Sequence, residues 1–237
     1  DDVMISYHLS MPEPHTHYYE VGMTVSNNLD KTVQLKMPVW TPGSYLVREF
    51  ARHIPRVRAY AGTQQLKVKK IDKNSWEVQA GYYKEFTVMY RIYAYEQSVR
   101  TSYLSDSRGY LNGTSIFLYV ADRKYEPGEV KVTPFRGWRK ISTGLPKVKG
   151  QRNTFSFPDY DVLADSPFLI GNHDVLTFKV KGIPHEIALY GQGNVDKDQL
   201  KDDFKKIVQA TVDIFENLPY DRYVFFILML NGLGGGL

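Results

Sequence analysis

The chain has 237 residues, of which 43% are apolar and 24% are charged, so it can bury a core and lacks the composition of a disordered protein. Cysteine is absent, which excludes disulfide bonds and thiolate chemistry. The net charge is +4, but the basic residues are spread along the chain, and no apolar stretch approaches the ~20 residues of a membrane helix, so we expect neither a nucleic acid nor a membrane as a partner.

Residues 1–174 are predicted to form an all-β domain. At 17–26, Val21, Met23 and Val25 alternate with polar or small residues, as in a half-buried strand. The 18 tyrosines and 12 phenylalanines also suit pleated surfaces. Turn signals separate further predicted strands, which lie at 32–38, 56–60, 65–71, 75–80, 85–95, 115–120, 129–134 and 153–157. This spacing is typical of a β-sandwich or a saddle-like pair of sheets.

The pattern changes after residue 174. Two strands at 175–180 and 185–190 precede an amphipathic helix, which Asp196 can cap and for which Gln199 can complete a capping box. Leu200, Phe204, Ile207, Val208, Thr211, Phe215 and Leu218 follow helical spacing. The sequence YVFFILML at 223–230 then carries no charge, which predicts a strand that is buried on both faces.

A strand of this kind needs cover on both sides, yet one helix precedes it and seven residues follow it. Leaving its large side chains in water would cost ~1.5–3 kcal/mol each. We therefore expect residues 175–237 to be the start of a truncated α/β domain, whose remainder is missing, disordered or supplied by another chain. The expected fold class is mainly β, with this α/β segment following the N-terminal domain.

No catalytic motif is found in the sequence. HEIAL at 185–189 has leucine where the zinc motif HExxH needs its second histidine, and it alternates like a strand instead of a helix. His15 and His17 could join a zinc site with a third ligand, or belong to a polar loop. The three aspartates between 159 and 165 could serve acid–base chemistry, or form turns and caps. We predict no catalytic residue and no metal ligand within the chain.

Three segments carry a resemblance to a known family. They are PVWTPGSYLVREFARH at 38–53, YDVLADSP at 160–167, and LPYDRYVFFILML at 218–230 with GGGL at 234–237. In this order they resemble the N-terminal β domain, the exit from that domain, and the strand and glycine-rich edge before the catalytic centre of glycyl aminopeptidases. These are thermolysin-like zinc metallopeptidases, and the resemblance covers essentially the whole chain.

The resemblance implies a parent protein that hydrolyses small N-terminal residues, such as Gly or Ala, from peptides. Its partners would be peptide substrates and the rest of its own catalytic domain. Zinc is implied as the cofactor of the full-length protein, where it would activate a water and polarise the scissile carbonyl. The family's zinc ligands lie beyond the matched segments, so this 237-residue chain is expected to be inactive by itself.

The resemblance assigns substrate binding to the glycine-rich end, at Gly234, Gly235, Gly236 and Leu237. Backbone groups there would pair with an extended peptide as an added strand, and the alternative is a flexible connector. Trp40, Tyr45 and Arg48 are candidates for the wall of the substrate cleft. The alternative for this segment is a turn in which Trp40 and Tyr45 fill the core.

A different class of function is a binding module without catalytic activity, either for carbohydrates or for other proteins. An aromatic-rich β-sandwich can stack rings on sugars, and the candidates are Tyr82, Tyr83, Tyr93, Tyr95 and Trp138. Against this class, the helix and apolar strand after residue 174 belong to no simple sandwich. The Asp1-Asp2 start and the absence of cysteine favour a periplasmic or secreted protein, with a cytoplasmic one as the alternative.

Overall fold

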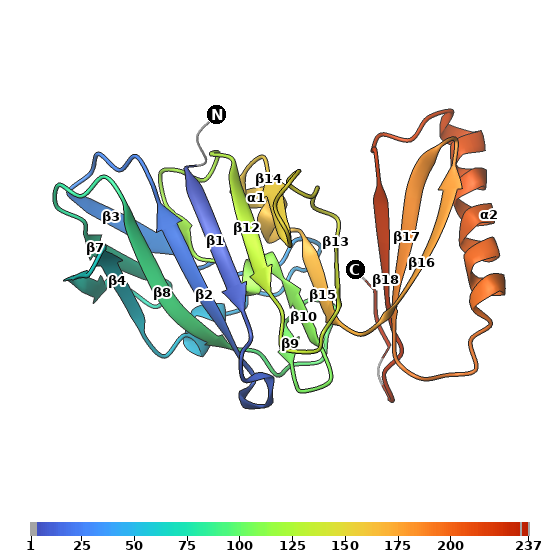
Figure 1. The fold of residues 1–237 in the computed structure, drawn as a ribbon, viewed down its shortest axis with the longest axis horizontal. Coiled ribbons are helices and arrows are strands. Elements are labelled where there is room, and N and C mark those ends of the chain that lie inside the picture. The colour runs from blue at the N-terminus through green and yellow to red at the C-terminus, as the bar shows by residue number, and fades with distance from the viewer. Residues whose placement is uncertain (1–3, 233, 237) are drawn as a thin grey trace.

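The structure is a computed structural model that describes residues 4–232 and 234–236. Within these residues the strands form four sheets, three in the N-terminal part and the fourth in the C-terminal part (Figure 1). The prediction of a mainly β fold is confirmed, because strands greatly outnumber helices among the described elements.

The largest sheet consists, in spatial order, of β14 (Thr154–Phe157), β12 (Gly128–Thr133), β1 (Ile5–Ser10), β2 (Tyr18–Val25), β8 (Phe86–Tyr93), β4 (Val57–Ala61) and β5 (Gln64–Leu66). β1 pairs antiparallel with β2 and parallel with β12, so the sheet is mixed. Val21, Met23 and Val25 are fully buried on β2, as their alternation predicts.

Two four-stranded sheets complete the β domain. One consists of β11 (Tyr119–Val120), β3 (Thr32–Lys36), β7 (Ser75–Gln79) and β6 (Val68–Lys70). The other consists of β13 (Lys140–Thr143), β15 (Pro167–Gly171), β10 (Gly109–Asn112) and β9 (Tyr103–Leu104). None of the strands of this second sheet was among those expected from the sequence. The strand expected at 115–120 is reduced to β11 at its last two residues, and the 3-10 turn Gly113–Ser115 lies at its start. Two further 3-10 turns are Pro14–Thr16 and Phe50–His53.

One hydrophobic cluster fills the β domain between these sheets. Three buried tyrosines, Tyr7, Tyr90 and Tyr160, donate hydrogen bonds of 2.6 Å to the carbonyl oxygens of residues 116–118. Burial raises the pKa of all three hydroxyls, so they stay protonated donors. The short helix α1 (Tyr160–Ala164) begins after Asp159, whose carboxylate accepts the Val162 N–H. Asp159 is thus a helix cap, as the cap-and-turn alternative for the aspartates at 159–165 predicts.

Residues 174–232 form a three-stranded sheet with one helix. The sheet consists of β16 (Asp174–Val180), β17 (Ile183–Tyr190) and β18 (Tyr223–Leu228), with β16 antiparallel and β18 parallel to β17. The helix α2 (Lys197–Phe215) packs on one face of the sheet, and the other face packs on the β domain. Figure 1 shows α2 on the side of this unit that faces away from the β domain.

α2 begins where the sequence predicts, because the Asp196 side chain accepts the N–H groups of Asp198 and Gln199. The capping box is wrong: the Gln199 amide donates to the carboxylate of Asp203 instead. The predicted apolar stripe is also partly wrong. Val208 and the unpredicted Val212 are buried, whereas Ile207 and Phe215 are exposed.

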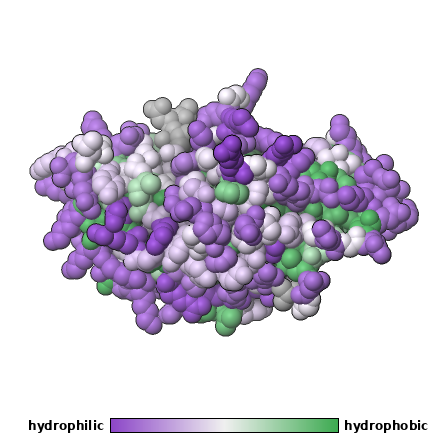
Figure 2. Space-filling view, turned by 60° about the horizontal axis from the view of Figure 1, so that its bottom comes forward, coloured by the Kyte–Doolittle hydropathy of each residue, from purple (hydrophilic) through white to green (hydrophobic). Residues whose placement is uncertain are grey.

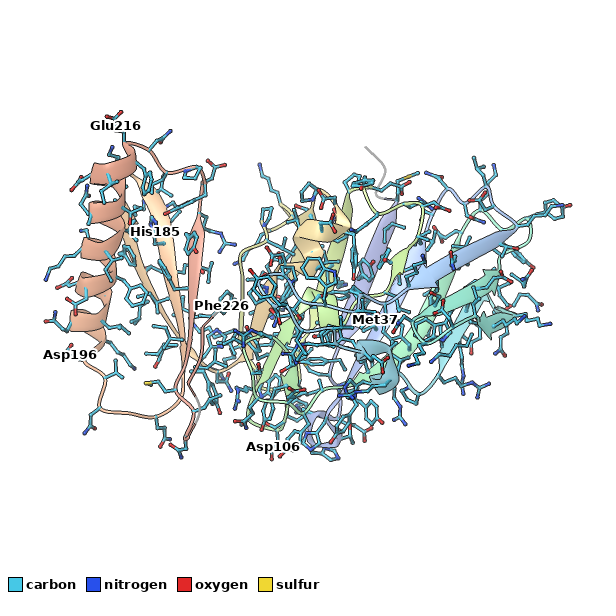
Figure 3. The ribbon with its side chains drawn as sticks, turned by 180° about the vertical axis from the view of Figure 1, so that it is seen from behind. Met37, Asp106, His185, Asp196, Glu216 and Phe226 are labelled. Carbon is cyan, nitrogen blue, oxygen red and sulfur yellow. The ribbon has the colours of Figure 1, made fainter. Side chains whose placement is uncertain are left out.

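β18 differs from the central strand that its composition predicts. Among the described residues it pairs with β17 alone, so it is an edge strand and its side chains are half-buried or exposed. Its two faces are nevertheless both in apolar contact. Phe225 and Ile227 pack toward α2, and Val224, Phe226 and Leu228 pack toward the β domain, where Figure 3 shows Phe226. This alternation explains why the segment carries no charge.

Arg222 links the two parts of the chain just before β18. Its guanidinium donates hydrogen bonds of 2.7 and 2.9 Å to the carbonyl oxygens of Thr143 and Leu145 in the β domain. It also lies 3.4 Å from the carboxylate of Glu186 on β17. One side chain therefore orients the start of β18 relative to both sheets.

Candidate functional site

The candidate site is a cavity of about 520 Å³ between the β domain and β18. Residues of the loop before β9 and of β9 and β10 form one side, and the end of β18 with the first glycines of the GGG run forms the other. The lining residues are Gln97, Ser98, Val99, Arg100, Tyr103, Arg108, Tyr110, Phe226, Ile227, Leu228, Leu230, Gly234 and Gly235. The structure thus brings Gly234 and Gly235 to a concave surface beside the edge strand.

The glycine segment is open to an approaching chain. A Cβ atom added at Gly234, Gly235 or Gly236 would meet no described atom within 4 Å. Since neither packing nor a backbone conformation reserved for glycine requires these residues, their small size serves either close approach of another molecule or chain flexibility. Gly236 is not among the lining residues, and Leu237 lies outside the described residues.

A hydrogen-bonded loop fixes the opposite wall of the cavity. The Val99 carbonyl accepts hydrogen bonds from the Tyr110 hydroxyl at 3.2 Å and the Asn112 amide at 2.6 Å. The buried Thr41 hydroxyl donates to the Arg100 carbonyl at 3.1 Å. Burial raises the pKa of Tyr110 to about 12, so its hydroxyl is a neutral donor at ordinary pH. This wall is therefore held by the domain core, whatever occupies the cavity.

The charged residues that line the cavity are both basic. Arg100 and Arg108 line it, and no aspartate or glutamate is among its lining residues. The Nε atoms of both arginines are buried and have no hydrogen-bond partner among the described residues. The cavity thus combines an apolar floor, an unpaired strand edge and two cationic side chains, an arrangement that suits a peptide.

The other predicted site residues are not at this cavity. Trp40 lines a separate cavity of about 790 Å³ near α1, and Tyr45 lines none of the larger cavities of the described chain. Arg48 lies 3.9 Å from Glu96, next to the first lining residue of the candidate site. The core-filling alternative is wrong for both aromatic rings, because Trp40 is 54% exposed and Tyr45 is fully exposed.

Two of the three remaining histidine candidates, His17 and His185, have hydrogen-bonded rings, and His15 is exposed. His185 lies on β17, fully buried, with its ring nitrogens bonded to the Ile183 carbonyl and the Tyr220 hydroxyl at 3.0 Å. His15 lies in a 3-10 turn instead of on a strand, and His17 follows it with its Nδ1 2.6 Å from the Leu104 carbonyl. No group of three or more metal-binding side chains occurs in the described chain. No helix described here is long and apolar enough to span a membrane.

Of the aromatic candidates, Tyr93 and Tyr95 lie close together, with ring centroids 5.9 and 3.7 Å from that of His17. Trp138, proposed for sugar stacking, is only 8% exposed and packs against Phe135. Tyr82 precedes β8 and Tyr93 ends it, so the strand separates them by roughly 24 Å at ~3.4 Å per residue. Tyr95 stacks on Tyr103. Tyr82 and Trp138 therefore do not join Tyr93 and Tyr95 in one carbohydrate-binding face.

Sequence reasoning missed Tyr103, Arg108 and Tyr110, which form much of the cavity wall. They lie on β9, β10 and the turn between them, short strands without a clear alternation of polar and apolar residues. Every residue of β10 is buried. A short segment that is buried on both faces has no alternation of polar and apolar residues, so periodicity alone does not identify it as a strand.

Comparison with known proteins gives a family match that ends where the β domain ends. Residues 6–172 match the family model described as the Peptidase M61 N-terminal domain. An aminopeptidase N family protein from Idiomarina loihiensis is 34% identical with a TM-score of 0.91, over 98% of this chain and 40% of that one. No curated protein matches.

An M1 zinc metallopeptidase from Deinococcus radiodurans shares the fold, with 14% identity and a TM-score of 0.58 for an E323A variant, over 98% of this chain and 57% of that one. The same enzyme without the substitution gives 15% identity and a TM-score of 0.56. The chain thus spans about half the length of these solved relatives, or less. Because the family match covers most of the chain, the chain belongs to the Peptidase M61 N-terminal domain family.

Proposed function

We propose that the parent protein is a zinc-dependent aminopeptidase that removes small N-terminal residues, Gly or Ala, from peptides. In this proposal residues 1–237 supply the β domain and the peptide-binding edge and have no catalytic activity alone. The observation that carries the proposal is the cavity in which an unpaired strand edge and two small, sterically open glycines face the β domain. An extended peptide can add to such an edge through its main chain.

The surface of the C-terminal unit supports a larger parent protein. Ile207, Ile214 and Phe215 of α2 are 61%, 73% and 71% exposed. Figure 2 shows apolar surface on this unit, at the right of the view. Exposed apolar side chains that gather on one element are typical of a surface that another part of a protein covers. The rest of the catalytic domain is the occupant that the family relationship suggests.

Zinc belongs to the proposal only through the relatives, which are named as zinc metallopeptidases. The described residues do not fit a zinc site, because they include no suitable cluster of histidine, aspartate and glutamate. We therefore assign the metal ligands to the part of the parent protein outside this chain, and no reaction step to the residues described here. The contribution of this chain is to bind and orient the peptide.

The test is hydrolysis of Gly- and Ala-arylamides by the full-length protein, with Leu- and Phe-arylamides as size controls. We expect preference for the small residues, loss of activity with a zinc chelator and recovery with added zinc. The 237-residue chain, assayed at the same concentration, should release no arylamine. Chelator-insensitive cleavage, or no cleavage of any aminoacyl substrate, would contradict the proposal.

A further inference from the structure

Arg108 is held rigidly in the wall of the candidate site. It lies in the turn between β9 and β10 and is only 4% exposed. Its guanidinium carbon is 4.3 Å from the ring centroid of Tyr103 on β9 and 4.4 Å from that of Tyr190 at the end of β17. One ring comes from each part of the chain, so the two parts clamp the guanidinium between aromatic faces.

Among the described residues, this buried cation has no carboxylate partner of the kind that such groups normally have. No ion pair or side-chain hydrogen bond joins it to any residue within 4–232 or 234–236, and its Nε is a buried donor without an acceptor. Asp106, two residues earlier in the same turn and labelled in Figure 3, is exposed, and it is not among the ion-paired side chains of the described residues. Aromatic faces attract a cation, but they do not satisfy in-plane N–H donors, which prefer a carboxylate or a carbonyl oxygen.

Arg108 lines the same cavity as the glycine edge. Arg108 and Gly234 both line it, and Arg100 adds a second positive charge whose Nε is also buried without a partner. A guanidinium fork matches a carboxylate with two parallel hydrogen bonds. The two buried Nε donors without an acceptor among the described residues, the positive charge of both arginines and the peptide-sized cavity therefore select a negatively charged group on the molecule that enters.

We propose that Arg108 binds a carboxylate of the peptide substrate, downstream of the residue that is removed. The inference rests on the proposed function, because it assumes a peptide along the edge of β18 and the glycines. The carboxylate is either the C-terminal carboxylate of a short peptide or the side chain of an acidic residue. Arg108 is thus a specificity residue, which favours short or acidic peptides over uncharged ones.

Matched peptide pairs test the inference on the full-length protein. Ala-Ala-Ala and Ala-Ala-Ala-Ala are compared with their C-terminal amides, and Ala-Ala-Asp-amide and Ala-Ala-Ala-Asp-amide with the corresponding Asn peptides. We expect kcat/KM for the charged member of at least one pair to be roughly tenfold higher, the size of one charge-assisted contact. The first set reports a C-terminal carboxylate and the second an acidic side chain. Equal kcat/KM within every pair would overturn the inference.

Arg108→Met should reduce the ratio of kcat/KM between the charged and the uncharged peptide to about one, whatever its effect on the absolute rates, and Arg108→Lys should leave an intermediate ratio. Arg58→Met, at an exposed position on β4 outside the cavity, is the matched control and should keep the wild-type ratio. If Arg108→Met changes stability but leaves the ratio unchanged, Arg108 is only a clamp between the two parts and the inference is wrong. If Arg108→Met does not fold, the Arg108→Lys ratio decides.

Calorimetric binding of the same peptide pairs separates this inference from the proposed function. A preference for the charged peptide in binding, lost in the Arg108 variant, supports the carboxylate contact even if no peptide is hydrolysed. Hydrolysis of Ala peptides with no charge preference in binding or turnover supports the peptidase and overturns the role of Arg108.

Discussion

Replacing Arg222 by methionine should loosen the C-terminal unit from the β domain. The substitution keeps an unbranched apolar stem but removes the hydrogen bonds of the guanidinium to the Thr143 and Leu145 carbonyls and its contact with Glu186. Thr143 and Leu145 are both 2% exposed, so methionine leaves acceptors that water reaches poorly. The structure therefore predicts a cost beyond the loss of a surface ion pair.

The expected magnitude follows from these contacts. A hydrogen bond from a charged donor contributes ~1.5–3 kcal/mol, and two of them give at least about 3 kcal/mol. The Arg222 side chain is 27% exposed, so solvent offsets part of this, and we expect a loss of about 2 kcal/mol. For a chain of this size that corresponds to a decrease in Tm of about 4–8 °C.

Thermal unfolding and hydrogen exchange together test the reasoning. Deuterium uptake in Arg222→Met should rise in β16, β17 and β18 and stay unchanged in the seven-stranded sheet, because the β domain has its own core. Arg58→Met serves as the control for loss of an exposed arginine. An unchanged Tm, or a uniform increase in uptake over both parts, would refute the idea that Arg222 couples them.

Three further predictions concern other parts of the chain. Gly113→Ala should reduce soluble yield and Tm severely, because the new Cβ would overlap the Leu163 carbonyl oxygen of α1. The control Gly144→Ala has open space around the new Cβ and should match wild type in the same assays. Equal stability of the two variants would contradict the packing around Gly113. His173 is buried beside Ser142, and burial lowers its pKa from 6.5 to about 4. Between these pH values the unfolded chain binds more protons than the folded one, so the free energy of unfolding should fall by about 3 kcal/mol at most as the pH drops from 6.5 to 4. Urea titrations should find this decrease absent in His173→Gln. Gly235→Val in the full-length protein should lower kcat/KM for Ala peptides roughly tenfold or more with an unchanged Tm. The new side chain meets no described atom, but it stands where we place the substrate. Wild-type kinetics would favour the alternative that the glycines are a flexible connector.

The sequence alone was sufficient for elements whose patterns are local. The alternation in β2, the Asp196 cap of α2 and the assignment of the HEIAL segment to a strand depend on neighbouring residues only, and each is confirmed. The mainly β class followed from many such segments. The family resemblance also depended on contiguous motifs, and the Peptidase M61 N-terminal domain match supports its coarser form. Preference for Gly or Ala stays a prediction.

Only the tertiary structure decided what the candidate site contains. Whether β18 is central or at an edge depends on which strands pair beside it, and its uncharged sequence is compatible with either, because both faces are in apolar contact in each case. Arg108 is ordinary in the sequence. It becomes a buried cation because β9 and β10 bring it between Tyr103 and Tyr190, which lie far apart along the chain, and its Nε has no acceptor in the part of the chain that the structure describes. Burial and pairing are properties of residues that meet in space, and local patterns do not encode them.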